Sequence, residues 1–185
     1  MAERFVALLR GINVGTAKRV AMPVLRALVE ELGYTDVKTL LNSGNVVFSG
    51  AAGELKKAPQ RIQAALEKKL GVSARVMVLS AAELAAVMKA DPFGRIAGNL
   101  SRYMVGILGE QSDREKLAEV IAKSWGGEQI ALGSGAASRA LFMWIPDGVI
   151  ESRLNAAVGK VLKDGVTARN WSTMSKLHEM TKPEK

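Results

Sequence analysis

The side chains in this sequence that could do chemistry are cations and amides gathered in three short stretches, at residues 10–15, 43–48 and 167–171. Arginine and lysine bind phosphate and carboxylate groups through charge and hydrogen bonds, and asparagine supplies both donors and acceptors. The chemistry these stretches indicate is therefore anion binding, or catalysis through charge and positioning.

Other kinds of catalysis have little support in the sequence. There is no cysteine, which removes thiolate zinc sites, disulfides and cysteine nucleophiles. The single histidine, His178, lies near the C-terminus and has neither a partner serine nor a second metal ligand four residues on. Glu30 and Glu31 are the one adjacent acidic pair, and neighbours on a helix point apart. We expect no metal and no cofactor, and whether the protein is an enzyme stays open.

The first stretch lies between a predicted strand and a predicted helix. Lys18 and Arg19 follow it, and the N–H groups at the start of the helix would converge with these cations on one spot. This arrangement favours phosphate. The alternative is that Gly11 and Gly15 only permit a turn, that Asn13 satisfies its own backbone and that the cations are solvated. The spacing matches neither a Walker loop nor a dinucleotide fingerprint.

The second and third stretches also end at turns. Ser43 and Asn45 offer donors and acceptors at a hairpin tip, where such groups usually serve the turn itself. Arg169 and Asn170 end a predicted strand, with Trp171 just before the last helix. A guanidinium beside an indole could stack on a base or bind a carboxylate or phosphate. Equally, Trp171 could only anchor the helix.

All three stretches fall at strand ends, where loops collect, and each holds a polar residue with no evident role in its own element. We therefore expect them to meet in one cleft between two units of the chain, although independent turn and capping roles are the alternative. The expected ligand-binding residues are Arg10, Asn13, Lys18, Arg19, Ser43, Asn45, Arg169, Asn170 and Trp171.

The hydrophobic pattern of the first half predicts the element order βαββαβ. Pro23 suits a first helical turn, and Gly33 and Gly71 suit helix ends. A linking helix follows from Ser80, which has capping-box spacing to Glu83. The expected strands are residues 4–9, 37–41, 45–48 and 75–79, and the expected helices are residues 22–32 and 58–70.

The second half repeats this order. Strands are expected at residues 103–108, 129–132, 140–145 and 166–169. Ser112 begins a capping box for a helix that buries Leu117, Val120, Ile121 and Trp125. Ile150, Leu154, Val158 and Val161 predict the next helix, and a last one runs from Ser172 to about Met180.

A duplicated βαββαβ order predicts an α+β fold of two ferredoxin-like units, each an antiparallel sheet with two helices on one face, followed by a C-terminal helix. We expect residues 1–90 to form the first unit with the linking helix. Residues 91–185 would form the second unit with the C-terminal helix. The turn at residues 91–94 marks the expected boundary.

The net charge of +8 favours anionic partners, and Lys plus Arg exceed Asp plus Glu by 13 to 7 in residues 1–90. Nucleic acid is a possible but less favoured partner, because many of these cations lie on solvated helix faces. Phe142 and Trp144 share one strand face, which is more typical of core than of an RNA-binding platform. No apolar run approaches membrane-spanning length, and no leader sequence is evident, so we expect a cytoplasmic protein with no membrane partner.

The three stretches, together with Thr173, Lys176 and Leu177, resemble the domain-of-unknown-function family numbered 1697. The resemblance implies a bacterial protein with a ferredoxin-like duplication and brings no activity with it. The chain departs from the family pattern at Thr16, where a second glycine is usual, and a Cβ there would limit the closest approach of a ligand.

The sequence thus favours a protein that binds a phosphate-bearing or other anionic ligand. A nucleic-acid-binding module is the second possibility. An enzyme that works through Arg, Lys and Asn without a metal is the third.

Overall fold

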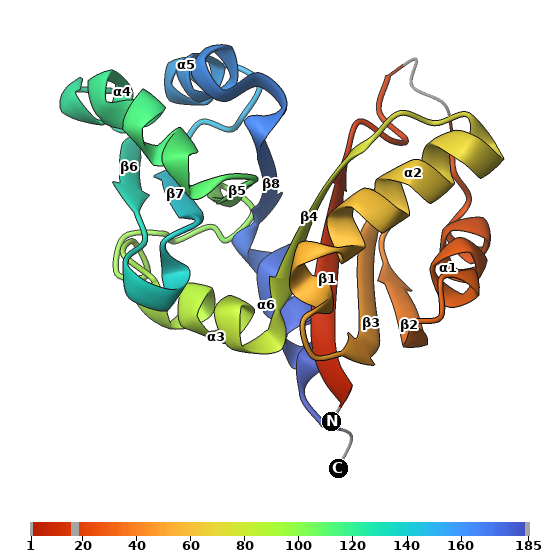
Figure 1. Cartoon of the computed structure of the whole chain (residues 1–185). Coiled ribbons are helices and arrows are strands. Elements are labelled where there is room, and N and C mark those ends of the chain that lie inside the picture. The colour runs from red at the N-terminus through yellow and green to blue at the C-terminus, as the bar shows by residue number, and fades with distance from the viewer. Residues whose placement is uncertain (1, 16–18, 184–185) are drawn as a thin grey trace. The chain divides into compact units, whose positions relative to one another are not determined.

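The computed structural model describes residues 2–15 and 19–183, and the chain divides into two compact units (Figure 1). The first unit comprises Met1–Leu84 with Leu177–Lys185, and the second comprises Ala85–Lys176. The divisions fall inside two helices, α3 (Ala81–Ala90) and α6 (Trp171–Thr181).

The first unit holds one antiparallel sheet in the order β2-β3-β1-β4. Its strands are β1 (Ala2–Arg10), β2 (Thr35–Leu40), β3 (Asn45–Ala51) and β4 (Arg75–Ser80). Two helices, α1 (Met22–Glu31) and α2 (Ala58–Leu70), accompany the sheet, and a short 3-10 turn, η1 (Glu54–Lys56), precedes α2.

Both helices cover the same face of this sheet (Figure 1). Leu25 and Leu28 of α1 and Ile62 and Leu66 of α2 lie in one core with alternate strand residues such as Phe5. Because side chains alternate along a strand, the intervening residues point to the other face. Arg10, Arg75 and Asn45 lie at strand ends on this other face.

The second unit repeats the arrangement, with sheet order β6-β7-β5-β8. Its strands are β5 (Tyr103–Leu108), β6 (Gln129–Leu132), β7 (Ala140–Trp144) and β8 (Val166–Asn170). Its helices are η2 (Gln111–Leu117) continuing into α4 (Ala118–Ala122), and α5 (Arg153–Leu162), with short 3-10 turns η3 (Gly135–Ala137) and η4 (Lys163–Gly165). Two four-stranded antiparallel sheets with helices, and a C-terminal helix, confirm the predicted α+β class and are consistent with duplicated βαββαβ units.

Some helix limits and inward residues were predicted wrongly. The helix α5 begins at Arg153, where Ser152 caps it by accepting a hydrogen bond from the Asn155 N–H at 2.9 Å. Ile150 therefore precedes the helix and is 91% exposed. Between β5 and β6, Ser112 does not cap η2, and Ile121 of α4 is exposed rather than buried.

Candidate functional site

The side-chain amide of Asn13 joins the two described parts of the loop after β1. Its nitrogen donates to the carbonyl oxygens of Val20 at 2.9 Å and of Asn42 at 2.8 Å, and its oxygen accepts from the Val20 N–H at 2.7 Å. Asn13 has φ 54°, a left-handed conformation that asparagine tolerates better than most residues. Its hydrogen bonds fix the start of α1, two residues beyond Val20, and join this loop to the β2–β3 hairpin.

The hairpin tip comprises residues 41–44 and is organised by Asn45. This side chain is fully buried, and its nitrogen donates to the Leu40 carbonyl at 2.8 Å and to the Ser43 hydroxyl at 3.0 Å. Both predicted site residues of this stretch therefore take part in the turn itself. The carbonyl of Gly44 also accepts a hydrogen bond from the Leu9 N–H at 2.8 Å.

The first two predicted stretches are thus in direct contact. The backbone of Gly44 packs closely against Leu9 and Ile12. Its φ is 77°, and a Cβ added there would lie 2.7 Å from Ile12 Cδ1 and 2.8 Å from Leu9 Cβ. Those distances are too short for a side chain, so only glycine fits without displacement of its neighbours. The structure brings these two parts of the predicted site together within the first unit.

Two arginines are neighbours in the sheet, next to the contact between the loop after β1 and the hairpin tip. Arg10 pairs with Arg75 at the end of the β1–β4 ladder, one residue beyond the pair Leu9–Val76. Leu9 and Val76 face the core under the helices, so Arg10 and Arg75 point to the opposite face of the sheet. Asn45 lies on that face too, because it pairs with Leu8. Sequence reasoning missed Arg75, whose importance depends on strand register.

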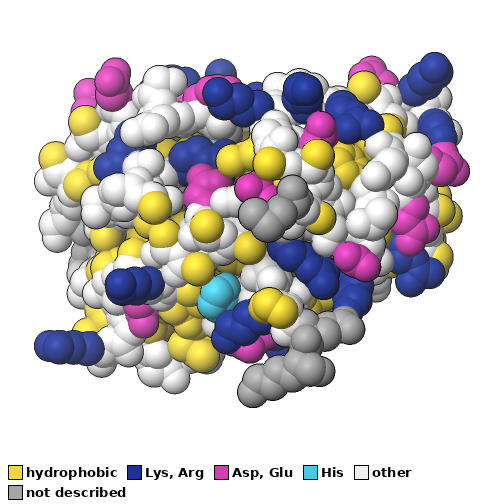
Figure 2. Space-filling view, turned by 60° about the horizontal axis from the view of Figure 1, so that its bottom comes forward, with side chains coloured by type: hydrophobic (Ala, Val, Ile, Leu, Met, Phe, Trp, Pro, Cys, Tyr) yellow, Lys and Arg dark blue, Asp and Glu magenta, His cyan; other side chains and the backbone are white. Residues whose placement is uncertain are grey.

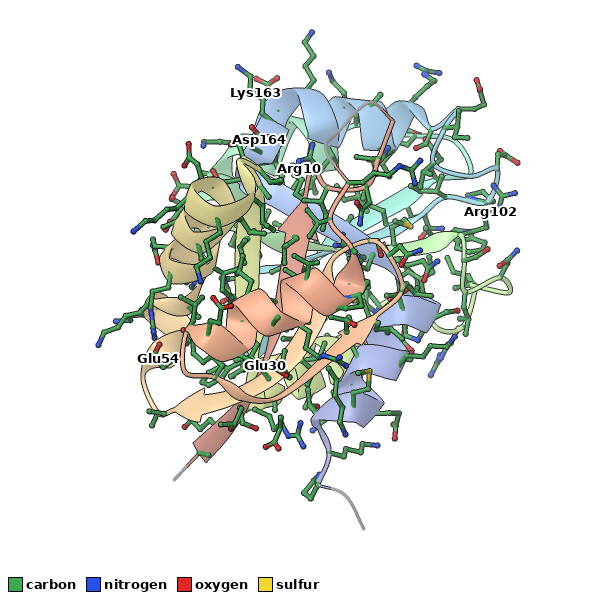
Figure 3. All side chains as sticks on the ribbon, turned by 90° about the vertical axis from the view of Figure 1, so that its right-hand side faces the viewer. Arg10, Glu30, Glu54, Arg102, Lys163 and Asp164 are labelled. Carbon is green, nitrogen blue, oxygen red and sulfur yellow. The ribbon has the colours of Figure 1, made fainter. Side chains whose placement is uncertain are left out.

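We call this region the loop end of the first unit, defined as residues 10–15, 19–20, 41–45 and 71–75. Figure 3 shows Arg10 at this end of β1, with Glu54 and Glu30 at the other end of the unit. No residue of the loop end carries a carboxylate, and Arg19 adds an exposed cation. Lys18, also predicted for the site, lies outside the described residues. Elsewhere, on the face shown in Figure 2, basic side chains lie among acidic and apolar ones.

The third stretch belongs to the second unit, and its groups have local structural roles there. The side-chain oxygen of Asn170 accepts the Thr173 N–H at 2.9 Å, so Asn170 caps α6, which begins at Trp171 rather than at Ser172. Arg169 donates to the Ala168 carbonyl at 2.8 Å. Whether this stretch shares a site with the other two stays a prediction.

Trp171 is largely buried, at 9% exposure, and its ring stacks on Tyr103 with centroids 4.5 Å apart and planes 6° apart. The Tyr103 hydroxyl donates to Asp91 at 3.1 Å, and burial raises the pKa of Tyr103 strongly. Phe142 is completely buried and neighbours the same tyrosine. These rings form core packing, as predicted for Phe142, and Trp171 anchors the last helix.

A further polar cluster, not predicted from sequence, ties together the opposite end of the first unit. The Tyr34 hydroxyl donates to Glu54 at 2.8 Å, and Arg61 donates to the same carboxylate oxygen at 2.8 Å. Arg61 also donates to the Leu32 carbonyl and lies 5.1 Å from the centre of the Tyr34 ring. The hydrogen bond from Tyr34 lowers the pKa of Glu54. With its charges mutually satisfied, this cluster connects α2 to the end of α1.

Within the described part of the chain, no group of three or more His, Asp or Glu side chains could hold a metal ion. His178 Nδ1 and Arg4 Nη1 are buried and have no hydrogen-bond partner among these described residues. Among the same residues, no helix is both long and apolar enough to cross a membrane.

The comparisons with known proteins agree with this architecture. A family model described as "Protein of unknown function (DUF1697)" matches residues 2–137. The chain belongs to this family, as its motifs predicted, although the third stretch lies beyond the matched residues. No curated protein is similar enough to count as a match.

One similar solved structure is titled "The structure of conserved bacterial protein SP0830 from Streptococcus pneumoniae". The similarity has a TM-score of 0.79, with 22% sequence identity, and covers 98% of this chain and all of the other. At this identity the similarity shows a shared fold and carries no function.

Proposed function

We propose that this protein binds a small phosphate-bearing or other anionic ligand at the loop end of the first unit. The observation that carries the proposal is the pairing of Arg10 with Arg75 directly across the β1–β4 ladder. Because the two residues are direct neighbours on one face of the sheet, a single anion could contact both guanidinium groups. Guanidinium groups bind phosphate and carboxylate oxygens through paired hydrogen bonds.

Hydrogen bonds that hold Asn13 and the hairpin tip in place without a ligand support the proposal. Asn13 joins the loop after β1 to Val20 and Asn42, and Asn45 fixes the hairpin tip. A binding site organised in this way loses less conformational entropy when the ligand binds. In this interpretation, the two asparagines position the site and the arginines contact the ligand.

Backbone groups add to the positive character of the region. Gly11 and Gly15 have positive φ angles, and no group of the described residues lies within 4 Å of where their side chains would be, so a ligand could approach their backbone closely. The helix α1 begins with Ala21 as its N-cap, without a side-chain cap and without an acidic residue in its first turn. The positive end of this helix dipole, two residues beyond Val20, adds positive character to the loop after β1.

Calorimetric titration of inorganic phosphate and pyrophosphate into the full chain tests the proposal. Arg75→Ala should weaken binding about 10–100-fold, which corresponds to a charge-assisted hydrogen bond of about 1.5–3 kcal/mol. Arg26→Ala is the matched control, because it removes the same charge from an exposed position on α1, where Arg26 meets Glu30 at 4.0 Å. Its affinity should stay near that of the wild type.

Equal losses in the two variants would contradict a specific site and indicate general charge attraction. Absence of binding to either anion would reject the proposal. Binding of short RNA or DNA with a steep salt dependence, unaffected by Arg75→Ala, would favour a nucleic-acid-binding module instead.

A further inference from the structure

We propose that the ligand is an organic phosphate with an apolar or aromatic group, of the size of a nucleoside monophosphate, and that Leu41 and Val14 contact this group. The inference rests on the proposed function and narrows its ligand class. It comes from two exposed aliphatic side chains in the loops beside the arginine pair.

Leu41 is placed where neither burial nor backbone conformation favours leucine. It has φ 57°, in the left-handed region, and it is 56% exposed. A leucine in this conformation is strained, and its apolar side chain gains little from folding at such exposure. Asparagine or glycine would suit the position better for stability. Strained residues that stability does not explain are concentrated at binding and catalytic sites.

Val14 provides a second exposed aliphatic group near the first. It is 60% exposed and follows Asn13, whose amide donates to the carbonyl of Asn42, the residue after Leu41. The two apolar side chains therefore flank one hydrogen bond that joins their loops. Together they offer apolar contact area beside a basic region, which matches a ligand with an apolar end and an anionic end.

The strand order sets the distance that such a ligand must span. The hairpin tip lies over β2 and β3, and the arginine pair lies on β1 and β4, in a sheet ordered β2-β3-β1-β4. Neighbouring strands are about 4.8 Å apart, so the centres of the two regions are separated by two strand spacings, roughly 10 Å. Inorganic phosphate is too small to reach both. A nucleoside monophosphate, with a sugar between phosphate and base, is long enough.

The experiment compares inorganic phosphate, ribose phosphate and adenosine monophosphate by calorimetry on the full chain. Adenosine monophosphate should bind the wild type about tenfold more tightly than ribose phosphate, the gain typical of burying one aliphatic side chain. Leu41→Asn should remove most of this gain, and Val14→Ser should act in the same direction. Ile150→Asn is the matched control, because Ile150 is an exposed aliphatic residue in the second unit.

Leu41→Asn should also raise the midpoint of thermal unfolding, which shows that any lost affinity does not arise from misfolding. If adenosine monophosphate binds no better than ribose phosphate, or if Leu41→Asn leaves its affinity unchanged, the inference fails while the arginine site stands. If no phosphate compound binds, the proposed function fails as well. Binding to phosphatidylglycerol vesicles that adenosine monophosphate does not compete would assign the loops to a lipid surface and overturn the inference.

Discussion

Individual asparagines, rather than the cations, organise the loop end of the first unit. Asn13 and Asn45 were singled out because their own elements gave them no evident role, yet both donate hydrogen bonds that hold turns. The alternative that Asn13 satisfies nearby backbone therefore describes its observed contacts. Its further bond to Asn42 depends on the tertiary structure, and the sequence alone could not show that contact.

The two tyrosines of the chain, Tyr34 and Tyr103, are both buried, so their ionisation should differ between the folded and unfolded protein. Burial, followed by the hydrogen bond to Glu54, raises the pKa of Tyr34 to about 12, and burial raises the pKa of Tyr103 as well. An unfolded tyrosine ionises near pH 10. The native protein should therefore show little tyrosinate absorbance at about pH 10, whereas the denatured protein should show much.

These raised pKa values make the stability of the protein depend on pH. Because both folded pKa values lie above the unfolded value, their contribution to stability is complete below about pH 10 and is lost as pH rises through the folded values. Glu54→Gln removes a carboxylate that favours protonated Tyr34, so it should lower the pKa of that tyrosine. Tyrosinate absorbance from both residues near pH 10 in the native protein would contradict the described burial.

Asn170, predicted to bind a ligand, accepts a hydrogen bond at the start of the last helix, α6. Asn170→Ala removes the acceptor for the Thr173 N–H and should destabilise the chain by about 1 kcal/mol. The melting temperature should fall by about 2–4 °C in a chain of this size. Asn170→Asp keeps the acceptor and should retain most of the stability. Equal losses in both variants, measured by calorimetry without ligand, would contradict the capping role.

Strands and helices were predictable where apolar periodicity was strong. The strand at residues 103–108 and the helix at residues 58–70 have the predicted limits, because flanking turns and glycines reinforce their periods. The helix α5 shows the opposite case. Ile150 fits its apolar spacing, but Ser152 accepts the Asn155 N–H and starts the helix later. Local capping chemistry overrode the hydrophobic period there.

At the scale of the molecule, the duplication was evident from element order, and the candidate site was only partly evident. Arg10 and the hairpin were found because they fall in recognisable stretches. Arg75 was missed, since its place opposite Arg10 follows from the antiparallel register of β1 and β4. The cluster of Tyr34, Glu54 and Arg61 was missed for the same reason, because its members come together only in the folded unit.

The most direct test of anion binding at the loop end is backbone amide chemical-shift mapping during titration with pyrophosphate. We expect saturable shifts at residues 10–15, 19–20, 41–45 and 75, and we expect these shifts to be lost in Arg75→Ala but not in Arg26→Ala. Additional shifts at residues 169–171 would support the hypothesis that the third stretch shares the site. Saturable shifts confined to other residues, or no shifts at all, would contradict anion binding at the loop end.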